Sequence, residues 1–511
     1  LTLGRDAQGA VRGEVHADGI DLKIATALLD YLPVPRDAKA QALRFAPRGR
    51  LTGSSLVWTG ESPAQAKSLA LKARFEDLAI NAVEGYPGAT GLTGDLEADE
   101  KGGRLRLASR GFTFEARHLF AAPLAFDAVD AEATWRRAAD GLEVRILQAT
   151  LSNADLALST SGTWQAVAEQ PGRRSPGRVN FRGRIEHARL GALPSYLPHA
   201  IAETRAWLAR AIESGEAKGG RFELAGDLWD FPFHGGQGGR FLAESPIAGA
   251  RLRYHPAWPA VERIAGDIRL ANESVEVRAA EAAIYSSRLV RTRAHIADML
   301  ADPPLLEIDG TAETTGGDSV RFLRETPLVE GPGAFTGAVA VEGAARAKIR
   351  IAYPLWGRDP VRVAGEYAFD GATASVGRSL AMRGVKGTLA FTERSVSAPA
   401  LAGTMFGQPA MLRLSTQPDG AVLTQLEGRL DAKALGTFVP QAFSRRMAGS
   451  TEWKARVVSG GQGTELRVDS SLAGLAIGLP EPFAKTAAQA RSLAGVVRHL
   501  GTDAEVTRAT L

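Results

Sequence analysis

Histidines and carboxylates are the side chains of this sequence best suited to acid–base chemistry or metal binding. The eight histidines fall singly along the chain, with no pair four residues apart and no HExxH motif. We therefore favour solvent-facing or turn histidines over a metal site. They are His16, His118, His187, His199, His234, His255, His295 and His499.

One carboxylate pair and one glycine-rich loop deserve comparison with known catalytic motifs. Asp227 and Asp230 flank Trp229 and could do acid–base work, but aspartate is an ordinary turn residue, so we expect a structural role. The run from Gly235 to Gly239 lacks the lysine and spacing of a phosphate-binding loop and predicts a hairpin connection. The sequence has no GxSxG elbow and no cysteine nucleophile. We predict a protein that is not an enzyme and carries no cofactor and no metal.

The elements that must position these residues are mostly strands. Apolar and polar residues alternate in Arg221–Leu224, Asp267–Leu270 and Val275–Arg278, which predicts strands with one dry face and one wet face. The same alternation recurs along most of the chain. A helix is predicted over 199–214, ended by Gly215, and a shorter one over 21–33, ended by Pro33. The tail after Ser492 has few turn signals and is expected to be helical or frayed.

Length and charge limit the architecture and the partners. A chain of 511 residues is too long for one core, so it forms several domains or one repetitive body. The net charge of +4, from 61 basic and 57 acidic residues, and the scattered arginines argue against a nucleic-acid partner. The strand arginines fit a solvated outer face, with phosphate contact at a groove rim as the alternative. They include Arg104, Arg106, Arg251, Arg253, Arg346 and Arg350.

A degenerate repeat divides the chain. Four times, a helical turn ends in apolar residues and proline, over 29–33, 194–198, 322–327 and 437–440. Three copies have an upstream aspartate that suits a helix cap: Asp21, Asp318 and Asp431. We expect four segments: 1–189 with a short N-terminal helix, 190–317 with a helix and the central groove, 318–430, and 431–511 with a truncated or frayed end.

The apolar face of so many strands needs a partner. Stacked sandwiches would supply one, but aromatic residues make up only 7% of the chain and helices are too few to cover the sheet. We therefore predict a mainly β fold: an elongated, curled antiparallel β-sheet trough, a repeating β-groove, with a few short helices. At this chain length we expect about 40 strands.

Several short motifs support a family resemblance. They include Phe231-Pro232-Phe233, Leu252-x-Tyr254-x-Pro256-x-Trp258-Pro259 and Gly428-Arg429-Leu430-Asp431. In their order and spacing, from about residue 45 to 495, the sequence resembles the periplasmic body of the YhdP family of AsmA-like envelope proteins. That family is similar to bridge-like lipid-transfer proteins and has no catalytic residues to transfer.

The resemblance has consequences for location and partners. It implies a periplasmic protein of a Gram-negative envelope, held in the inner membrane by an anchor outside this segment. It also implies phospholipids as partners, with movement between the two membranes, and a role in outer-membrane homeostasis. Outer-membrane or periplasmic proteins are further candidate partners. The absence of cysteine is compatible with the periplasm.

The inward strand residues are the candidate lipid-groove site, with a dry protein core as the alternative. A structural or assembly factor that binds envelope proteins through sheet edges is the second hypothesis. A glycan-acting enzyme is the third, although no carboxylate pair supports it. The helix that carries Trp207 could lie on a membrane, but we favour packing over the sheet. The candidate groove residues are Leu105, Leu107, Phe112, Phe114, Leu252, Tyr254, Ile268, Leu270, Val275 and Val277.

Overall fold

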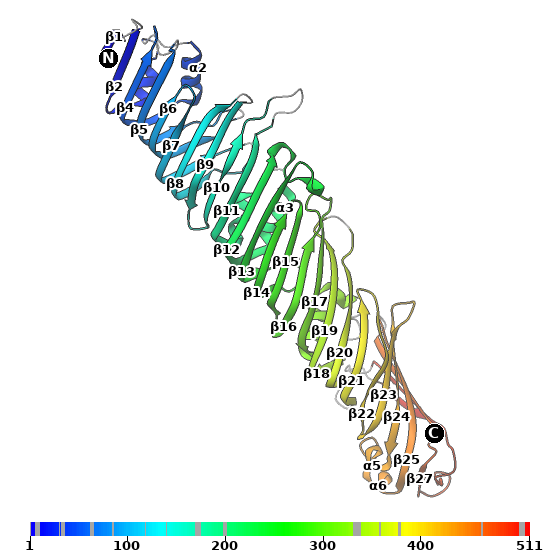
Figure 1. Cartoon of the computed structure of the whole chain (residues 1–511). Coiled ribbons are helices and arrows are strands. Elements are labelled where there is room, and N and C mark those ends of the chain that lie inside the picture. Colours follow the sequence, from blue (N-terminus) through cyan, green and yellow to red (C-terminus); the bar gives the residue numbers. More distant parts are fainter. Residues whose placement is uncertain are drawn as a thin grey trace. The chain divides into compact units, whose positions relative to one another are not determined.

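Long antiparallel strands dominate the computed structural model, with 65% of the residues in strands. Within the described residues, 29 strands form one antiparallel sheet that does not close, and the helices are few and short (Figure 1). The mainly β, antiparallel prediction is confirmed. The number of strands was overestimated because individual strands are long, reaching 16 residues in β12 (Ile212–Asp227). The described residues are 2–5, 11–29, 31, 36–61, 66–83, 86–117, 119–138, 141–168, 175–197, 202–330, 339–356, 359–376, 380–460, 463–499 and 506–510.

The chain forms two compact units. Unit 1 comprises Leu1–Leu252, Ala265–Val277 and Ala297–Asp302, and unit 2 comprises Arg253–Ile264, Arg278–Ile296 and Pro303–Leu511. Two of the predicted segment boundaries fall beside strand ends, at Arg189 in β11 and Asp431 in β24. The division into four segments nevertheless stays a prediction.

Unit 1 is built mostly from hairpins whose strands pair with their neighbours along the chain, from β4 to β13. The strands β14 (Val261–Ala271) and β15 (Ser274–Ile284) contribute residues to both units. The other strands are β1 (Thr2–Arg5), β2 (Val11–Ala17), β3 (Ile20–Asp21), β4 (Arg48–Thr59), β5 (Ser68–Ile80), β6 (Gly88–Asp99), β7 (Gly102–Glu115), β8 (Leu124–Ala138), β9 (Gly141–Ser152), β10 (Leu156–Gln165), β11 (Arg178–Arg189), β12 and β13 (Gly239–Leu252).

Unit 2 repeats the hairpin arrangement. The short β18 and the longer β19 both pair with β20, so together they act as one interrupted strand. Among the described residues after Ser492 there are two strands, which corrects the helical or frayed prediction: Leu493–Arg498 pairs with β26 on one side and with Val506–Thr510 on the other. The strands are β16 (Ser287–Ile296), β17 (Leu305–Thr315), β18 (Val339–Glu342), β19 (Ala344–Pro354), β20 (Arg362–Val376), β21 (Leu380–Thr392), β22 (Val396–Met405), β23 (Gln408–Thr416), β24 (Val422–Asp431), β25 (Met447–Gly460), β26 (Gly463–Ser470), β27 (Leu475–Ile477), β28 (Leu493–Arg498) and β29 (Val506–Thr510).

Helices α1, α4 and α5 each begin where a strand ends, and a side chain caps each of them. Asp21 accepts hydrogen bonds from the amides of Lys23 and Ile24 at the start of α1, and Asp431 accepts one from Ala434 at the start of α5. The predicted cap Asp318 is instead in the first turn of α4, where Thr315 is the cap. The helices are α1 (Leu22–Ala27), α2 (Arg36–Phe45), α3 (Ala202–Ala211), α4 (Gly316–Glu325), α5 (Ala432–Leu435) and α6 (Gln441–Ser444).

Helix α3 differs from the predicted helix over 199–214. It ends at Ala211 because Ile212 begins β12, so Gly215 lies in a strand and does not stop the helix. Residues 198–201 lie outside the described residues. Trp207 is 8% exposed, and the Thr204 hydroxyl donates to the Met299 carbonyl over 3.5 Å. The helix therefore packs on unit 1. The sequence analysis missed α2, where few apolar residues mark the helical period.

Within each unit, the connections that contain helices join strand ends on the same side of the sheet. In unit 1, successive paired strands reverse direction, so the α1–α2 and α3 connections both lie at the same ends of the strands. The same reversal of strand direction puts α4 and α5–α6 at the same strand ends in unit 2, and Figure 1 shows α5 and α6 beside the ends of β24 and β25.

Bulges interrupt the alternation inside many strands. Asp77 in β5, Gly91 in β6 and Gly111 in β7 have φ angles of 48°, 74° and 70°. The pairing register shifts beside the first two of these positions. Such bulges increase local twist and change which residues face a given side. They bend the sheet and explain why one uninterrupted period does not describe whole strands.

Glycines opposite aromatic residues form a second recurring device. A Cβ on Gly13 would lie 2.0 Å from a ring carbon of Trp58, and one on Gly103 would lie 2.3 Å from Trp135. These glycines are needed for space, because the ring of the neighbouring strand lies over the backbone. The cross-strand pairs are Gly13–Trp58, Gly103–Trp135, Gly183–Phe222, Gly365–Phe391 and Gly428–Trp453.

Candidate functional site

An open cavity of about 520 Å³ lies on one face of strands β2 to β7 in unit 1. Its size falls within the usual range of small-molecule sites, about 300–1,000 Å³. Almost every lining side chain is aliphatic. The lining residues are Val15, Ala17, Ile20, Leu22, Leu51, Ser54, Ser55, Leu56, Leu71, Ala73, Phe75, Leu78, Leu92, Leu96, Leu105 and Leu107.

The cavity presents carbon and no ionisable group. Ser54 and Ser55 are its only polar side chains, and the Ser54 hydroxyl donates to the Ala17 carbonyl over 2.9 Å. A hydroxyl satisfied by the main chain adds little polarity to the wall. The wall therefore suits an apolar ligand held by surface burial rather than by directed polar contacts.

The alternation of β7 separates this cavity from a charged outer face. Leu105 and Leu107 are half-buried in the cavity wall, whereas Arg104 and Arg106 are exposed and contact Glu132 on β8. The hydrogen bond from Arg104 and the second from Arg106 hold the pKa of Glu132 below its usual value. Ion pairing across strands therefore accounts for these arginines. We name the charged side the outer face and the cavity side the inner face.

Most of the other predicted arginines are also ion-paired. Arg251 lies 2.8 Å from Glu213, Arg350 lies 3.2 Å from Asp309, and Arg346 lies 3.8 Å from Glu313. These contacts fit the predicted solvated face, where each exposed pair contributes little to stability. Arg253 differs because it is half-buried.

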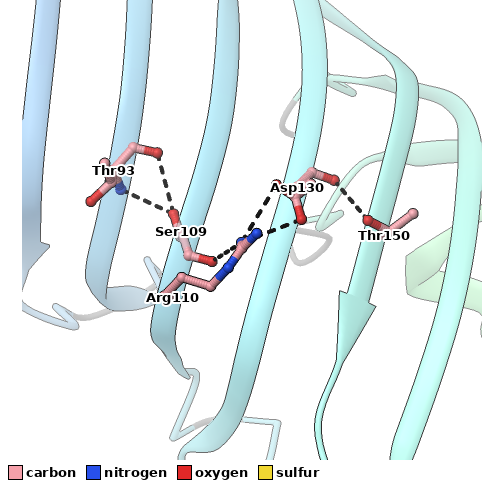
Figure 2. A network of polar contacts seen from close by, with 5 residues as sticks. All are labelled: Thr93, Ser109, Arg110, Asp130 and Thr150. Carbon is pink, nitrogen blue, oxygen red and sulfur yellow. Dashed lines mark hydrogen bonds and ion pairs between the residues drawn. The ribbon is translucent and has the colours of Figure 1, made fainter.

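A buried polar contact marks the point where β7 changes face. Ser109 is fully buried, and its hydroxyl accepts from the Thr93 amide over 2.9 Å (Figure 2). The register between β6 and β7 shifts between Thr90 and Gly94, so this hydroxyl takes the place of a strand carbonyl. On the same strand, Arg110 contacts Asp130, whose carbonyl accepts from Thr150.

Beyond this bulge lie Phe112 and Phe114. Both are half-buried, and the Phe112 ring stacks on Phe126 with 6.2 Å between centroids. Phe112 and Phe114 have even residue numbers, whereas Leu105 and Leu107 have odd ones, and the left-handed Gly111 lies between the two pairs. Phe112 and Phe114 do not line the cavity, so the structure separates the two pairs.

The remaining predicted residues divide between a hairpin and an aromatic corner. Ile268 and Leu270 on β14 and Val275 and Val277 on β15 are half-buried, as is Leu252 at the end of β13. Tyr254 lies past that strand and is 5% exposed, with its ring 6.1 Å from Trp258 and 6.4 Å from Tyr353. Burial raises the pKa of Tyr254. None of these six residues lines the cavity.

In unit 2 the corresponding inner residues form a packed cluster across β20 to β26. Met382, Leu401, Met405, Trp453 and Leu466 are between 3% and 7% exposed. The Trp453 ring contacts Phe406 edge-on, at 6.1 Å between centroids. We call this set the packed cluster. Its members are packed against one another and almost fully buried, in contrast to the half-buried Leu105 and Leu107 of the cavity wall.

Asp227 and the glycine-rich loop take part in local structure. Asp227 accepts from the Ser175 hydroxyl over 2.5 Å and from the Trp229 amide over 3.0 Å, so it caps a short turn. The 235–239 loop joins the paired strands β12 and β13. Among the described residues, no group of three or more His, Asp or Glu side chains is arranged to hold a metal, and no helix is long and apolar enough to cross a membrane.

Most of the cavity wall was absent from the sequence-based site. The same period-2 signal that identified Leu105 and Leu107 is present in Leu71, Ala73 and Phe75, and again in Leu92 and Leu96. Sequence alone did not show that these strands are neighbours. Leu22 belongs to a helix, so strand alternation could not have found it.

Comparisons with known proteins identify the family of the chain. The family model described as YhdP protein matches residues 2–509. The chain belongs to the YhdP family. A curated relative, the intermembrane phospholipid transporter YhdP of Escherichia coli (strain K12), is 23% identical over 463 residues, which cover 85% of this chain. The chain spans about a third (35%) of the length of that YhdP relative. No solved structure matches.

Proposed function

We propose that the inner face of this protein binds the acyl chains of phospholipids and lets them move along the sheet between the two membranes of a Gram-negative envelope. The observation that carries the proposal is the carbon-lined cavity of unit 1. An acyl chain that leaves a bilayer for water costs about 0.8 kcal/mol for each CH₂ group. An apolar wall offsets most of that cost, and no covalent chemistry is required.

The Escherichia coli relative supports phospholipid as the cargo and a location between two membranes. Its name describes transport of phospholipid between membranes, and this chain shares its family. On this proposal the protein works in the periplasm, with an inner-membrane anchor outside the present segment and phospholipid as its cargo. Contacts with outer-membrane or periplasmic proteins belong to the same proposal.

Photo-crosslinking in cells tests the inner-face assignment. A photoreactive residue is placed at Leu107 in the cavity wall or at Arg106 on the outer face, one position away on the same strand. Labelled phospholipid is expected to form adducts at position 107 and not at 106. A probe at Leu252 reports whether the inner face also binds lipid beyond the cavity.

The opposite result has a defined meaning. If a folded and correctly located protein gives no adduct at 107, the acyl-chain proposal is wrong. The protein would then fit the alternative of an assembly factor that binds envelope proteins. Equal adducts at 106 and 107 would equally contradict an inner lipid-bearing face.

A further inference from the structure

The region of unit 2 where β24 ends and β25 begins carries exposed aromatic rings beside exposed cations. Phe438 and Phe443, in the α5–α6 connection, are 50% and 47% exposed, and Phe483 is 53% exposed. The Arg446 carbonyl accepts from the Gly478 amide over 2.7 Å, which places the loop that carries Phe483 beside this connection. We call these the basic aromatic patch: Lys433, Phe438, Phe443, Arg445, Arg446 and Phe483.

The cations of the patch differ from those on the strands. Lys433, Arg445 and Arg446 are exposed, and in the part of the chain that the structure describes their side chains have no ion-pair or hydrogen-bond partner. Residues 432–447 contain no aspartate or glutamate. On the outer face of the same unit, Arg413 pairs with Glu427 at 2.9 Å and Arg467 with Glu465 at 2.7 Å.

The rings also have a distinctive setting. Phe438 meets Phe406 edge-on at 5.3 Å, so one side of its ring is anchored while half of it stays exposed. Elsewhere, Trp229 is similarly exposed at 47%, but it lies between the carboxylates Asp227 and Asp230. Exposed rings therefore occur in both settings, and the patch combines them with three exposed cations against one exposed carboxylate, Glu481, on the loop that carries Phe483.

We propose that the basic aromatic patch binds the surface of a bilayer containing anionic phospholipid. Phenylalanine rings enter the boundary between headgroups and acyl chains, and lysine and arginine are attracted to the anionic headgroups. The patch is small, whereas a stable protein interface takes about 20–30 residues on each side. A bilayer needs no such matched surface. The proposal is independent of acyl-chain binding in the cavity.

Vesicle co-sedimentation of the full chain tests the proposal. The chain is expected to pellet with vesicles of phosphatidylcholine and phosphatidylglycerol, and far less with phosphatidylcholine alone. The variant R445Q/R446Q should lose about 25-fold in apparent affinity, because each basic residue near an anionic surface contributes about fivefold. The variant F438S/F443S should also bind more weakly, and added salt should weaken binding of the unmodified chain.

Matched variants separate the patch from net charge and from the cavity. R413Q/R467Q removes the same charge from the outer face and should retain binding, as should Trp229→Ser. Ala73→Phe, in the cavity wall, should pellet like the unmodified chain, so failure of the lipid-groove proposal would leave this test intact. Circular dichroism checks the fold of each variant. No binding to anionic vesicles, equal loss in R413Q/R467Q, or full binding by F438S/F443S would overturn the proposal.

Discussion

Strands with the same alternating pattern build the cavity of unit 1 and the packed cluster of unit 2, yet only the cavity is open. Nine of the sixteen residues in the cavity wall are leucines, of which Leu105 and Leu107 are half-exposed. In the packed cluster, Met382, Met405 and Trp453 are at most 6% exposed. The difference teaches that alternation defines an inner face but does not by itself decide whether that face is filled by side chains or open to a ligand.

The largest expected effect is on the packed cluster. Trp453→Ala removes a buried ring that contacts Phe406 and lies over Gly428. Such a truncation costs about 3–5 kcal/mol. Hydrogen exchange of the β24–β26 amides measures the local loss, because two units need not unfold together. Unchanged protection would show that the cluster is not a close-packed core.

A matched pair of leucines tests the comparison directly. Leu401→Ala, in the packed cluster, should destabilise its strands by about 2–5 kcal/mol. Leu105→Ala, in the cavity wall, should cost only about 1 kcal/mol, because the side chain is half-exposed and borders existing space. The measurement is again local hydrogen exchange. Equal losses at the two sites would contradict the distinction between an open and a filled inner face.

Filling the cavity should reduce lipid binding without loss of the fold. Ala73→Phe places a ring where at least two methylene groups of a ligand would lie, so lipid bound per protein should fall about tenfold. Lipid mass spectrometry of the purified chain measures the ratio. Lys72→Phe, on the outer face of the same strand, is the control and should bind lipid normally, although its ion pair with Glu97 is lost.

The smallest expected effect is on the attachment of helix α4 to unit 2. Burial alone would raise the pKa of Asp318 on α4, but hydrogen bonds from Ser286 and Ser287 outweigh it and hold that pKa below its usual value. The stabilisation is therefore present above the unfolded pKa near 4 and lost as pH falls through the lower folded value.

Protection factors of the α4 amides should accordingly fall between pH 6 and pH 3. The variant Asp318→Asn keeps an acceptor oxygen and should lose most of that pH dependence. An unchanged pH dependence in this variant would show that another group controls the docking of α4.

Sequence reasoning predicted the class of fold because alternation is local. Arg104 to Leu107 alternate in the sequence and in the structure, and Asp21 and Asp431 cap helices as expected. The site was less predictable because a cavity depends on which strands are neighbours. Leu22, Leu51 and Leu96 meet only through pairing of β3 to β7.

The bulges were the other obstacle. Asp77 is a non-glycine residue with a left-handed φ of 48°, and the neighbouring residues do not predict this conformation. The early end of α3 has a different cause, because pairing of β12 with β13 overrides the helical period from Ile212 onward. Helix α2 was missed because it has few apolar residues.

The cross-strand glycine and aromatic pairs have a consequence for the evolution of the sequence. Because the Trp58 ring fills the space above Gly13, a methyl group at 13 is tolerated only if position 58 becomes smaller. The two positions should therefore co-vary across homologous chains, and so, to a smaller extent, should Gly428 with Trp453, where a Cβ would lie 3.1 Å from the ring. Such coupled substitutions would mark adjacent strands in relatives for which only a sequence is known.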